Sequence, residues 1–248
     1  RVLIKFLYKK ANVVIGNSKG NSKDLVDNFK IQDATTIYNP IDFKSIKKLS
    51  DEYVSYRDEK FTFITIGRLD SGKNHMVMID AMQNIDAKLY IIGDGELRDS
   101  LELKIENLEL TDKVILLGKK SNPYKYLAQA DCFLFSSLYE GFPNVLLEAL
   151  ACGLPIISSD CQSGPREILA PSNDVEHQIK KDIEIAKYGI LTPVNDINFL
   201  IKAMNKMIED VNLQESYRST AKQKAKEFDV DTIIKRWRTV LDLDVGMI

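Results

Sequence analysis

Two basic side chains in the loop at residues 67–74 could together bind a phosphate or diphosphate group. The loop reads G-R-L-D-S-G-K-N and places Arg68 and Lys73 directly after the apolar run 61–66. Arginine holds phosphate oxygens with a planar fork, and lysine adds a point charge. The loop nearly matches the phosphate-loop pattern G-x-x-x-x-G-K-[ST], but Asn74 replaces the hydroxyl that would ligate magnesium. The loop therefore predicts an anion site, and a basic surface turn is the alternative.

Two glutamates with seven residues between them mark a second candidate, the segment 136–148. Glu140 lies in a loop after an apolar run, and Glu148 lies about one turn into a helix expected from Asn144 to Gly153, with Asn144 as its cap. The free amides at the start of that helix favour an anionic group. Both carboxylates would flank the anion site of the first loop. Alternatively, a glutamate there only stabilises the helix.

Two glycine-containing turns are weaker candidates. Gly93 and Gly95 form G-D-G after an apolar run, but Arg98 stands where the dinucleotide fingerprint needs a third glycine. A tight turn between a strand and a helix explains these glycines more simply. The S-G-P-R-E-I element at 163–168 could present further backbone amides, and taken alone it indicates a turn followed by a helix start.

Short apolar runs alternate with amphipathic segments, which is typical of a parallel sheet with helices on both faces. The expected strands lie at residues 12–16, 35–38, 61–66, 88–92, 113–117, 132–135, 155–159 and 188–192. The expected helices lie at residues 18–29, 75–85, 95–107, 123–130 and 144–152, with a purely helical pattern from 195 to about 244. Ligands bind beyond the carboxyl ends of strands in such sheets, so both charged loops should face one edge.

Composition restricts the class of protein. The chain has 248 residues, 44% of them hydrophobic, and a net charge of −2, which predicts a globular protein and gives no reason to expect nucleic-acid binding. Cys132, Cys152 and Cys161 are an odd number without metal-ligand spacing, which favours a reducing cytosol over a disulfide scaffold or a zinc site. We interpret His75 and His177 as structural or incidental. No apolar run approaches the roughly 20 residues that span a bilayer.

Charge is distributed unevenly along the chain. Residues 1–48 hold ten Lys and Arg against four Asp, a balance of +6, which leaves −8 for the remainder. Such a basic section suits an anionic surface, either membrane headgroups or a pyrophosphate-bearing substrate, and a solvated lysine-rich face is the alternative. The sequence begins at Arg1 inside an apolar pattern, without a helix cap or an initiator Met. This beginning favours a fragment of a longer protein.

Together these residues resemble the retaining glycosyltransferases of family 4, which have the two-domain GT-B fold. The resemblance rests on the Glu140–Glu148 element, the Gly67–Asn74 loop, G-D-G at 93–95, L-L-G at 116–118, and the segments 17–25 and 37–42. It implies an α/β fold: a Rossmann-like parallel sheet domain with C-terminal helices and the remnant of an N-terminal domain. The expected units are the acceptor-domain remnant 1–45, a linker 46–60, the donor-binding domain 61–225, and a helix 226–248 that crosses back.

The resemblance also assigns roles to single residues. In such enzymes the equivalents of Arg68 and Lys73 bind the nucleotide diphosphate and stabilise it as it leaves, and the equivalent of Glu140 contacts hydroxyls of the donor sugar. These three are the expected catalytic residues. The expected donor-binding residues are Gly67, Gly118, Lys119, Gly141, Phe142, Asn144, Val145 and Glu148. Among them Glu148 would bond the ribose, the backbone at 118–119 would meet the base, and the amides at 141–144 the sugar and phosphates. Pro143 replaces a frequent glycine and removes one amide donor.

The expected reaction is sugar transfer from a UDP-sugar, with UDP-GalNAc the leading candidate and another N-acetylhexosamine or hexose next. The S-G-P-R-E-I element resembles bacterial enzymes of O-antigen, capsule or lipid-linked glycan synthesis, so the expected acceptor is an undecaprenyl-diphosphate-linked sugar. The expected enzyme is cytoplasmic and peripheral on the inner face of the plasma membrane. Fixed cations and helix amides can stabilise a departing diphosphate, so we expect no cofactor and no metal. A P-loop-like nucleotide hydrolase and a non-catalytic nucleotide-sugar-binding module remain as alternatives.

Overall fold

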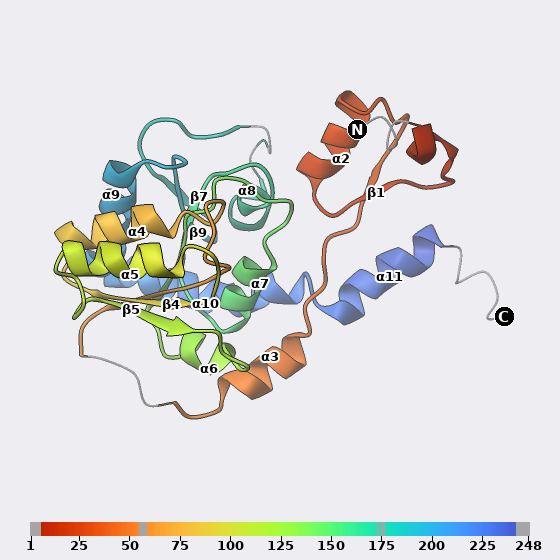
Figure 1. The fold of residues 1–248 in the computed structure, drawn as a ribbon. Helices are drawn as coiled ribbons and strands as arrows, with labels where there is room; N and C mark the ends of the chain where they lie inside the picture. Colours follow the sequence, from red (N-terminus) through yellow and green to blue (C-terminus); the bar gives the residue numbers. More distant parts are fainter. Residues whose placement is uncertain (1–5, 55–58, 173, 175–176, 242–248) are drawn as a thin grey trace.

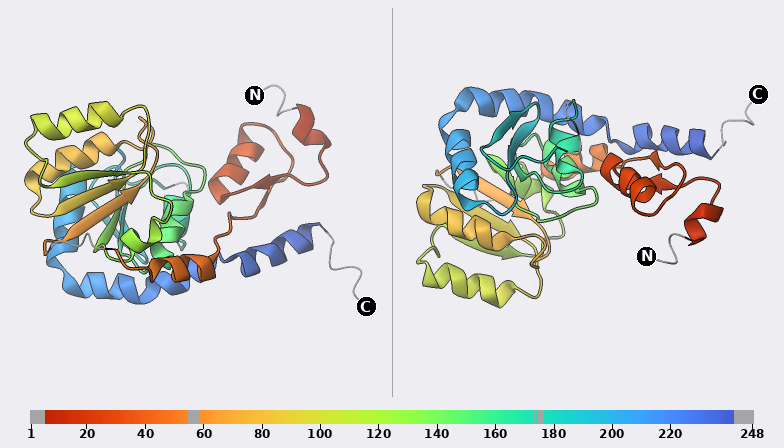
Figure 2. Two further views of the ribbon diagram at one scale, coloured as in Figure 1. Left: turned by 60° about the horizontal axis from the view of Figure 1, so that its bottom comes forward. Right: turned by 90° about the horizontal axis from the view of Figure 1, so that it is seen from above.

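The computed structural model describes residues 6–54, 59–172, 174 and 177–241. Most of them form a sheet covered by helices on both faces, which we call the sheet body (Figure 1). Residues 6–41 form a separate N-terminal segment beside it. The N-terminal segment and the last helix project from the same side of the sheet body in every view (Figures 1 and 2).

The sheet of the sheet body has the strand order β5-β4-β3-β6-β7-β9-β8. Its strands are β3 (Thr62–Ile66), β4 (Lys88–Ile92), β5 (Val114–Gly118), β6 (Cys132–Phe135), β7 (Ile156–Ser159), β8 (Glu184–Ala186) and β9 (Gly189–Thr192). All neighbours pair in parallel except β8, which runs antiparallel to β9 at one edge. The strand order reverses between β3 and β6, and ligands of open α/β sheets bind in the crevice at such a point.

Each face of the sheet packs against its own group of helices, because successive side chains of a strand point to opposite faces. Phe63 and Leu134 belong to a core that includes residues of α4 (His75–Ala81), α5 (Arg98–Asn107) and α9 (Ile197–Glu209). Ile64 and Phe133 belong to the other core, with residues of α3 (Phe43–Ser50), α6 (Tyr124–Leu127) and α7 (Asn144–Ala151), and with Ala221 and Ala225 of α10 (Val211–Lys226). The strands are thus apolar on both faces, as doubly covered strands must be.

The N-terminal segment contains a small parallel sheet. Its elements are η1 (Tyr8–Lys10), β1 (Ile15–Gly16), α2 (Lys19–Asp27) and β2 (Thr35–Thr36), and β1 pairs with β2. At Ile41 the segment pairs with the stretch just before the last helix. The Ile41 amide donates to Phe228 O, and the Ile41 carbonyl accepts from the Val230 amide. Helix α11 (Val230–Val240) begins at this point. The remaining short helices are η2 (Met82–Asn84) and α8 (Pro165–Leu169).

The structure differs from the sequence-based expectations in three places. The expected linker at 46–60 begins inside helix α3, which Asp42 caps by accepting from the Ser45 amide and which buries Phe43 and Ile46. Strand β8 was not predicted, because it has only three residues. The predicted cap of α7 is wrong: Asn144 is the first helical residue, and Pro143, in an extended conformation, occupies the cap position. Part of the linker, residues 55–58, and the stretch 242–248 lie outside the described residues.

Candidate functional site

The basic loop 67–74 connects β3 to α4 and rests on the G-D-G turn. The Gly67 amide donates to Ile92 O, and the Leu69 amide donates to Asp94 O, both at 3.0 Å. A Cβ on Gly93, where φ is +153°, would lie 1.9 Å from Gly67 O, and one on Gly95 would lie 2.5 Å from Leu69 O. Only glycine allows two backbone segments to approach this closely. The tight-turn interpretation of this motif is therefore confirmed.

Asp70 joins the two basic residues of the loop. Its carboxylate accepts from Arg68 Nε and, at 3.0 Å, from the Lys73 amide. Burial acts to raise the pKa of Asp70, but these hydrogen bonds outweigh it and hold the pKa below its usual value. The hydrogen bond that Arg68 donates to Asp70 in turn raises the pKa of Arg68. The carboxylate thus fixes the shape of the loop, a role that the position of Asp70 between Arg68 and Lys73 could have indicated.

Lys73 and Glu140 form an ion pair between the loops after β3 and β6. The Lys73 side chain is 30% exposed and that of Glu140 is 13% exposed. The Glu140 loop is held by two backbone hydrogen bonds, from the Glu140 amide to Gln162 O at 2.7 Å and from the Ser163 amide to Glu140 O at 2.8 Å. A Cβ on Gly67 would lie 3.4 Å from Lys73 Cγ. The strand-order reversal therefore places a cation and a carboxylate together at one edge.

Arg68 does not join this ion pair. Its side chain is 76% exposed and bonds Asp70. The structure therefore brings Lys73 and Glu140 together, and it connects Arg68 to them only through Asp70.

Helix α7 begins beside this pair, at Asn144. The Asn144 side chain is exposed and its Oδ1 accepts from Asn39 Nδ2 at 2.9 Å, so it serves the N-terminal segment and does not cap its own helix. The Leu146 amide donates to Pro143 O at 3.1 Å. Val145 packs partly buried against the core. The start of a helix offers backbone amides and the positive end of its dipole, so the first turn of α7 suits an anion.

Glu148 meets a different partner from Glu140. Its Oε1 accepts from the Tyr124 hydroxyl of α6 at 3.5 Å. Burial raises the pKa of Glu148, and the hydrogen bond that Tyr124 donates partly opposes this rise. Burial and the nearby carboxylate raise the pKa of Tyr124 to about 12. Glu148 is thus a half-buried acceptor with an adjacent hydroxyl, which is suited to binding hydroxyl groups of a ligand.

The predicted residues at 118–119 end strand β5. Gly118 has φ of +70°, and its carbonyl accepts from the Gly93 amide at 3.2 Å. Lys119 is exposed. These residues follow the carboxyl end of a parallel strand, as do Lys73 and Glu140, so they lie along the same edge of the sheet.

Gly141 and Phe142 connect the site to the N-terminal segment. Phe142 is buried and stacks on Tyr38, with ring centroids 4.9 Å apart, and it also packs on Phe228 at 5.7 Å. Its side chain therefore belongs to the core, and only its backbone can serve a ligand. A Cβ on Gly141 would lie 3.2 Å from Asn21 Nδ2 of α2.

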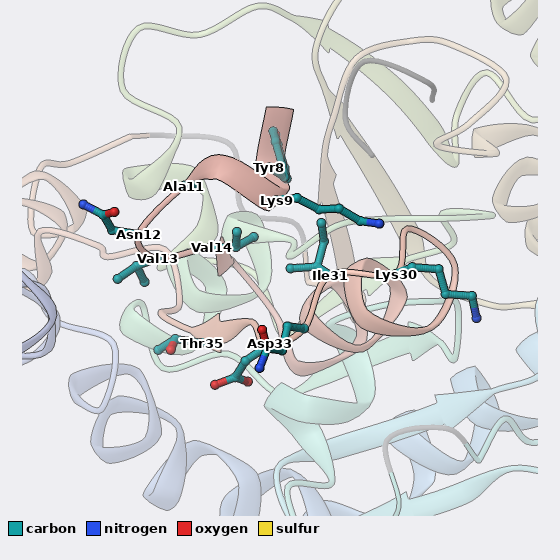
Figure 3. Close-up of a pocket in the computed structure, with 11 residues that line it drawn as sticks. Tyr8, Lys9, Ala11, Asn12, Val13, Val14, Lys30, Ile31, Asp33 and Thr35 are labelled. Carbon is teal, nitrogen blue, oxygen red and sulfur yellow. The ribbon is translucent and has the colours of Figure 1, made fainter. Parts of the chain in front are cut away.

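A polar pocket of about 360 Å³ opens between α2 and the Glu140 loop. It is lined by Gly20, Asn21, Lys23, Asp24, Asp27, Asn28, Tyr139, Glu140, Gln162 and Ser163. A larger pocket of about 630 Å³ lies wholly within the N-terminal segment, as Figure 3 shows, and contains none of the predicted site residues. The smaller pocket is the more relevant one, because it contains Glu140.

Among the described residues, no group of three or more His, Cys, Asp or Glu side chains is arranged to hold a metal ion. Asp229 and Asp231 have D-x-D spacing, but Asp229 Oδ1 accepts from the Phe43 amide and Asp231 pairs with Lys44. His75 is buried at the start of α4, and burial lowers its pKa to about 4. No helix in the described ranges is long and apolar enough to span a membrane.

Solved structures with this arrangement identify its fold. Staphylococcus aureus TarM, solved with UDP among its ligands, has a TM-score of 0.78 at 20% identity, over 96% of this chain and 45% of TarM. Anabaena HepE, in complex with UDP, has a TM-score of 0.77 at 24% identity, over 94% of this chain and 64% of HepE. The fold is that of the GT-B glycosyltransferases.

Residues 47–224 match the model of the family described as glycosyl transferases group 1. The chain belongs to this family of transferases, which confirms the resemblance drawn from its motifs.

Curated relatives are longer than this chain. The chain is 40% identical over 233 residues to a Campylobacter jejuni N-acetylgalactosamine-N,N'-diacetylbacillosaminyl-diphospho-undecaprenol 4-alpha-N-acetylgalactosaminyltransferase. That alignment covers 92% of this chain and 60% of the relative. An uncharacterized glycosyltransferase of Methanocaldococcus jannaschii is 37% identical over 96% of this chain and 65% of its own length. The chain thus spans less than two thirds of both relatives.

Proposed function

We propose that the whole protein transfers a sugar from a UDP-sugar to a lipid-linked glycan in bacterial surface polysaccharide synthesis, with retention at the anomeric carbon. The observation that carries the proposal is the Lys73–Glu140 pair at the strand-order reversal, beside a polar pocket. UDP as the nucleotide is supported by the UDP complexes of HepE and TarM. GalNAc as the sugar, and an undecaprenyl-diphosphate-linked sugar as the acceptor, are supported by the name of the Campylobacter relative.

In this proposal the diphosphate lies between the basic loop and the first turn of α7. The bond from the anomeric carbon to the phosphate oxygen breaks, and its electron pair leaves with UDP. The acceptor oxygen bonds the same carbon, and its proton passes to the departing phosphate. Lys73 and Arg68 stabilise the charge that develops on UDP, so the protein itself supplies what a metal ion would supply elsewhere.

Glu140 and Glu148 orient the donor in this proposal. Glu140 is positioned by Lys73 and accepts hydrogen bonds from sugar hydroxyls, while Glu148 accepts from the ribose. The backbone at 118–119 meets the base. The acceptor sugar lies in the pocket between α2 and Glu140, whose amide and carboxylate side chains suit hydroxyl and N-acetyl groups. The excess of positive charge in residues 1–48 suits a membrane-bound, diphosphate-linked acceptor and peripheral membrane binding.

The test is calorimetric titration of the chain with UDP, GDP, ADP and UDP-GalNAc, with and without EDTA. We expect UDP and UDP-GalNAc to bind without metal, and Lys73→Ala to weaken binding. Lys47→Ala is the matched control, because Lys47 is an exposed lysine of α3. Transfer by the whole protein should fall sharply in Glu140→Ala. Magnesium-dependent binding and hydrolysis of ATP or GTP, without uridine binding, would favour the P-loop alternative instead.

A further inference from the structure

Glu167 is a buried carboxylate whose partners lie in another part of the chain. It belongs to α8 and is 5% exposed. Its Oε2 accepts from the Lys19 amide at 2.7 Å, and its Oε1 accepts from the Gly20 amide at 3.0 Å. Both amides are in the first turn of α2, where backbone donors have no partner within the helix. A buried carboxylate is costly unless such donors satisfy it, so these two contacts depend on each other.

The turn before Glu167 fits closely against the same end of α2. Ser18 caps α2, and its hydroxyl donates to Ser163 Oγ at 3.3 Å, while the Ser163 hydroxyl donates to Asn21 Oδ1 at 3.3 Å. A Cβ on Gly20 would lie 2.6 Å from Ser163 Cβ. Only a glycine at position 20 allows the helix to lie this close.

Tyr38 of the N-terminal segment also packs against the sheet body near Glu167. Its ring stacks on Phe142, with ring centroids 4.9 Å apart. Burial and the negative charge of Glu167 raise the pKa of Tyr38. Glu167 therefore holds α2, and its charge is felt by Tyr38 in the stretch after β2.

These contacts lead directly to the candidate site. The turn that contains Ser163 is bonded through its backbone to Glu140, by the Ser163 amide to Glu140 O and by the Glu140 amide to Gln162 O. Residues of α2 form one wall of the polar pocket, and Glu140 and Ser163 belong to the opposite wall. The position of α2 relative to Glu140 is thus set where Glu167 binds the helix.

We propose that Glu167 is a positioning residue that fixes α2 over the Glu140 loop and so sets the width of the pocket for the acceptor sugar. This inference rests on the proposed function, because it assigns that pocket to the acceptor. Glu167 touches neither the diphosphate nor the reacting atoms. Its removal should therefore affect acceptor use far more than binding of UDP.

The test compares Glu167→Gln and Glu167→Ala with the unaltered whole protein. Glu106→Gln is the matched control, because Glu106 is an exposed glutamate of α5. Loss of charged hydrogen bonds should lower kcat/KM for a lipid-linked acceptor by roughly ten- to hundredfold, while Kd for UDP changes by less than about twofold. Hydrogen exchange should show lost protection of the Lys19 and Gly20 amides and unchanged protection in β3 and β6.

A second variant approaches the contact from the other side. Gly20→Ala leaves Glu167 intact but pushes α2 away from Ser163, and it should show the same split between acceptor and UDP. If the Glu167 variants do not fold, Gly20→Ala tests the inference on its own. Unchanged protection of the two amides, or lost protection with unchanged acceptor kinetics, would overturn the inference. If the unaltered protein transfers no sugar, the proposed function fails, and amide protection alone still reports whether Glu167 holds α2.

Discussion

Replacing Glu140 with glutamine should strengthen the binding of UDP while it weakens sugar transfer. In the structure Glu140 holds the ammonium group of Lys73. A diphosphate that uses Lys73 must therefore compete with this carboxylate. Glutamine keeps the size of the side chain and removes its charge, so Lys73 becomes free to meet the phosphate. The donor sugar, by contrast, loses a charged acceptor for its hydroxyls.

The size of the effect follows from the exposure of the pair. Exposed ion pairs contribute about 0.2–1 kcal/mol, and this pair lies at the upper end because its side chains are only 30% and 13% exposed. Release of about 1 kcal/mol corresponds to roughly fivefold tighter binding of UDP. Lys73→Ala instead removes a charged hydrogen bond to the phosphate, which should weaken binding roughly ten- to hundredfold. The double variant should behave like Lys73→Ala.

Calorimetric titration of UDP into the chain measures all three variants, with Glu106→Gln as the control. The gain in Glu140→Gln should shrink as salt is raised, because screening weakens the competing pair as well as the attraction of Lys73 for the phosphate. Weaker UDP binding in Glu140→Gln would refute the reasoning, since it would mean that the carboxylate helps to position Lys73 for the nucleotide and does not compete for it.

Three further predictions concern stability. Gly93→Ala should cost at least about 1–3 kcal/mol, the cost of a side chain at its positive φ, and should displace the basic loop because the new Cβ would lie 1.9 Å from Gly67 O, whereas Gly67→Ala, with ordinary contacts around its Cβ, should cost less in urea unfolding. Phe142→Ala should cost about 3–5 kcal/mol, while Tyr53→Ala, at an 81% exposed side chain, should leave Tm unchanged. His75 has a pKa of about 4 in the folded chain against an ordinary value of 6.5, so the unfolded chain binds the extra proton and stability falls as pH drops from 6.5 to 4. Between pH 7 and pH 4 the free energy of unfolding should therefore fall by about 3 kcal/mol more in the unaltered chain than in His75→Leu. An equal fall in the two proteins would contradict this prediction.

The strands of the sheet could be predicted from sequence because their signal is local. Runs such as 61–66 and 132–135 place apolar residues on both faces, and that pattern is typical of strands that helices cover twice. The three residues of β8 are too few to show a period. Helix α3 was assigned to a linker because its polar residues outnumber Phe43 and Ile46, although these two have helical spacing.

The sequence predicts the site residues that directly follow a strand, but it does not predict contacts between residues far apart in the chain. The basic loop and Glu140 each follow a strand, so the rule for strand ends brings them to one edge. Asn144 was expected to cap α7, yet its partner is Asn39, more than a hundred residues earlier. The partners of Glu167 are equally distant. Such contacts depend on how the N-terminal segment packs, which no local pattern records.

Two chain segments connect the sheet body to the N-terminal segment and to helix α11, and these two segments lie side by side. The chain enters the sheet body at Ile41 and leaves it at Asp229, and these residues form a parallel bridge, reinforced by the Phe43 amide bonded to Asp229 Oδ1. Two links tied side by side permit rotation about a single axis and resist sliding. Rotation about that axis would separate Lys19 and Gly20 from Glu167, so Glu167 holds α2 against the sheet body while the bridge between Ile41 and Asp229 keeps the two connecting segments in register.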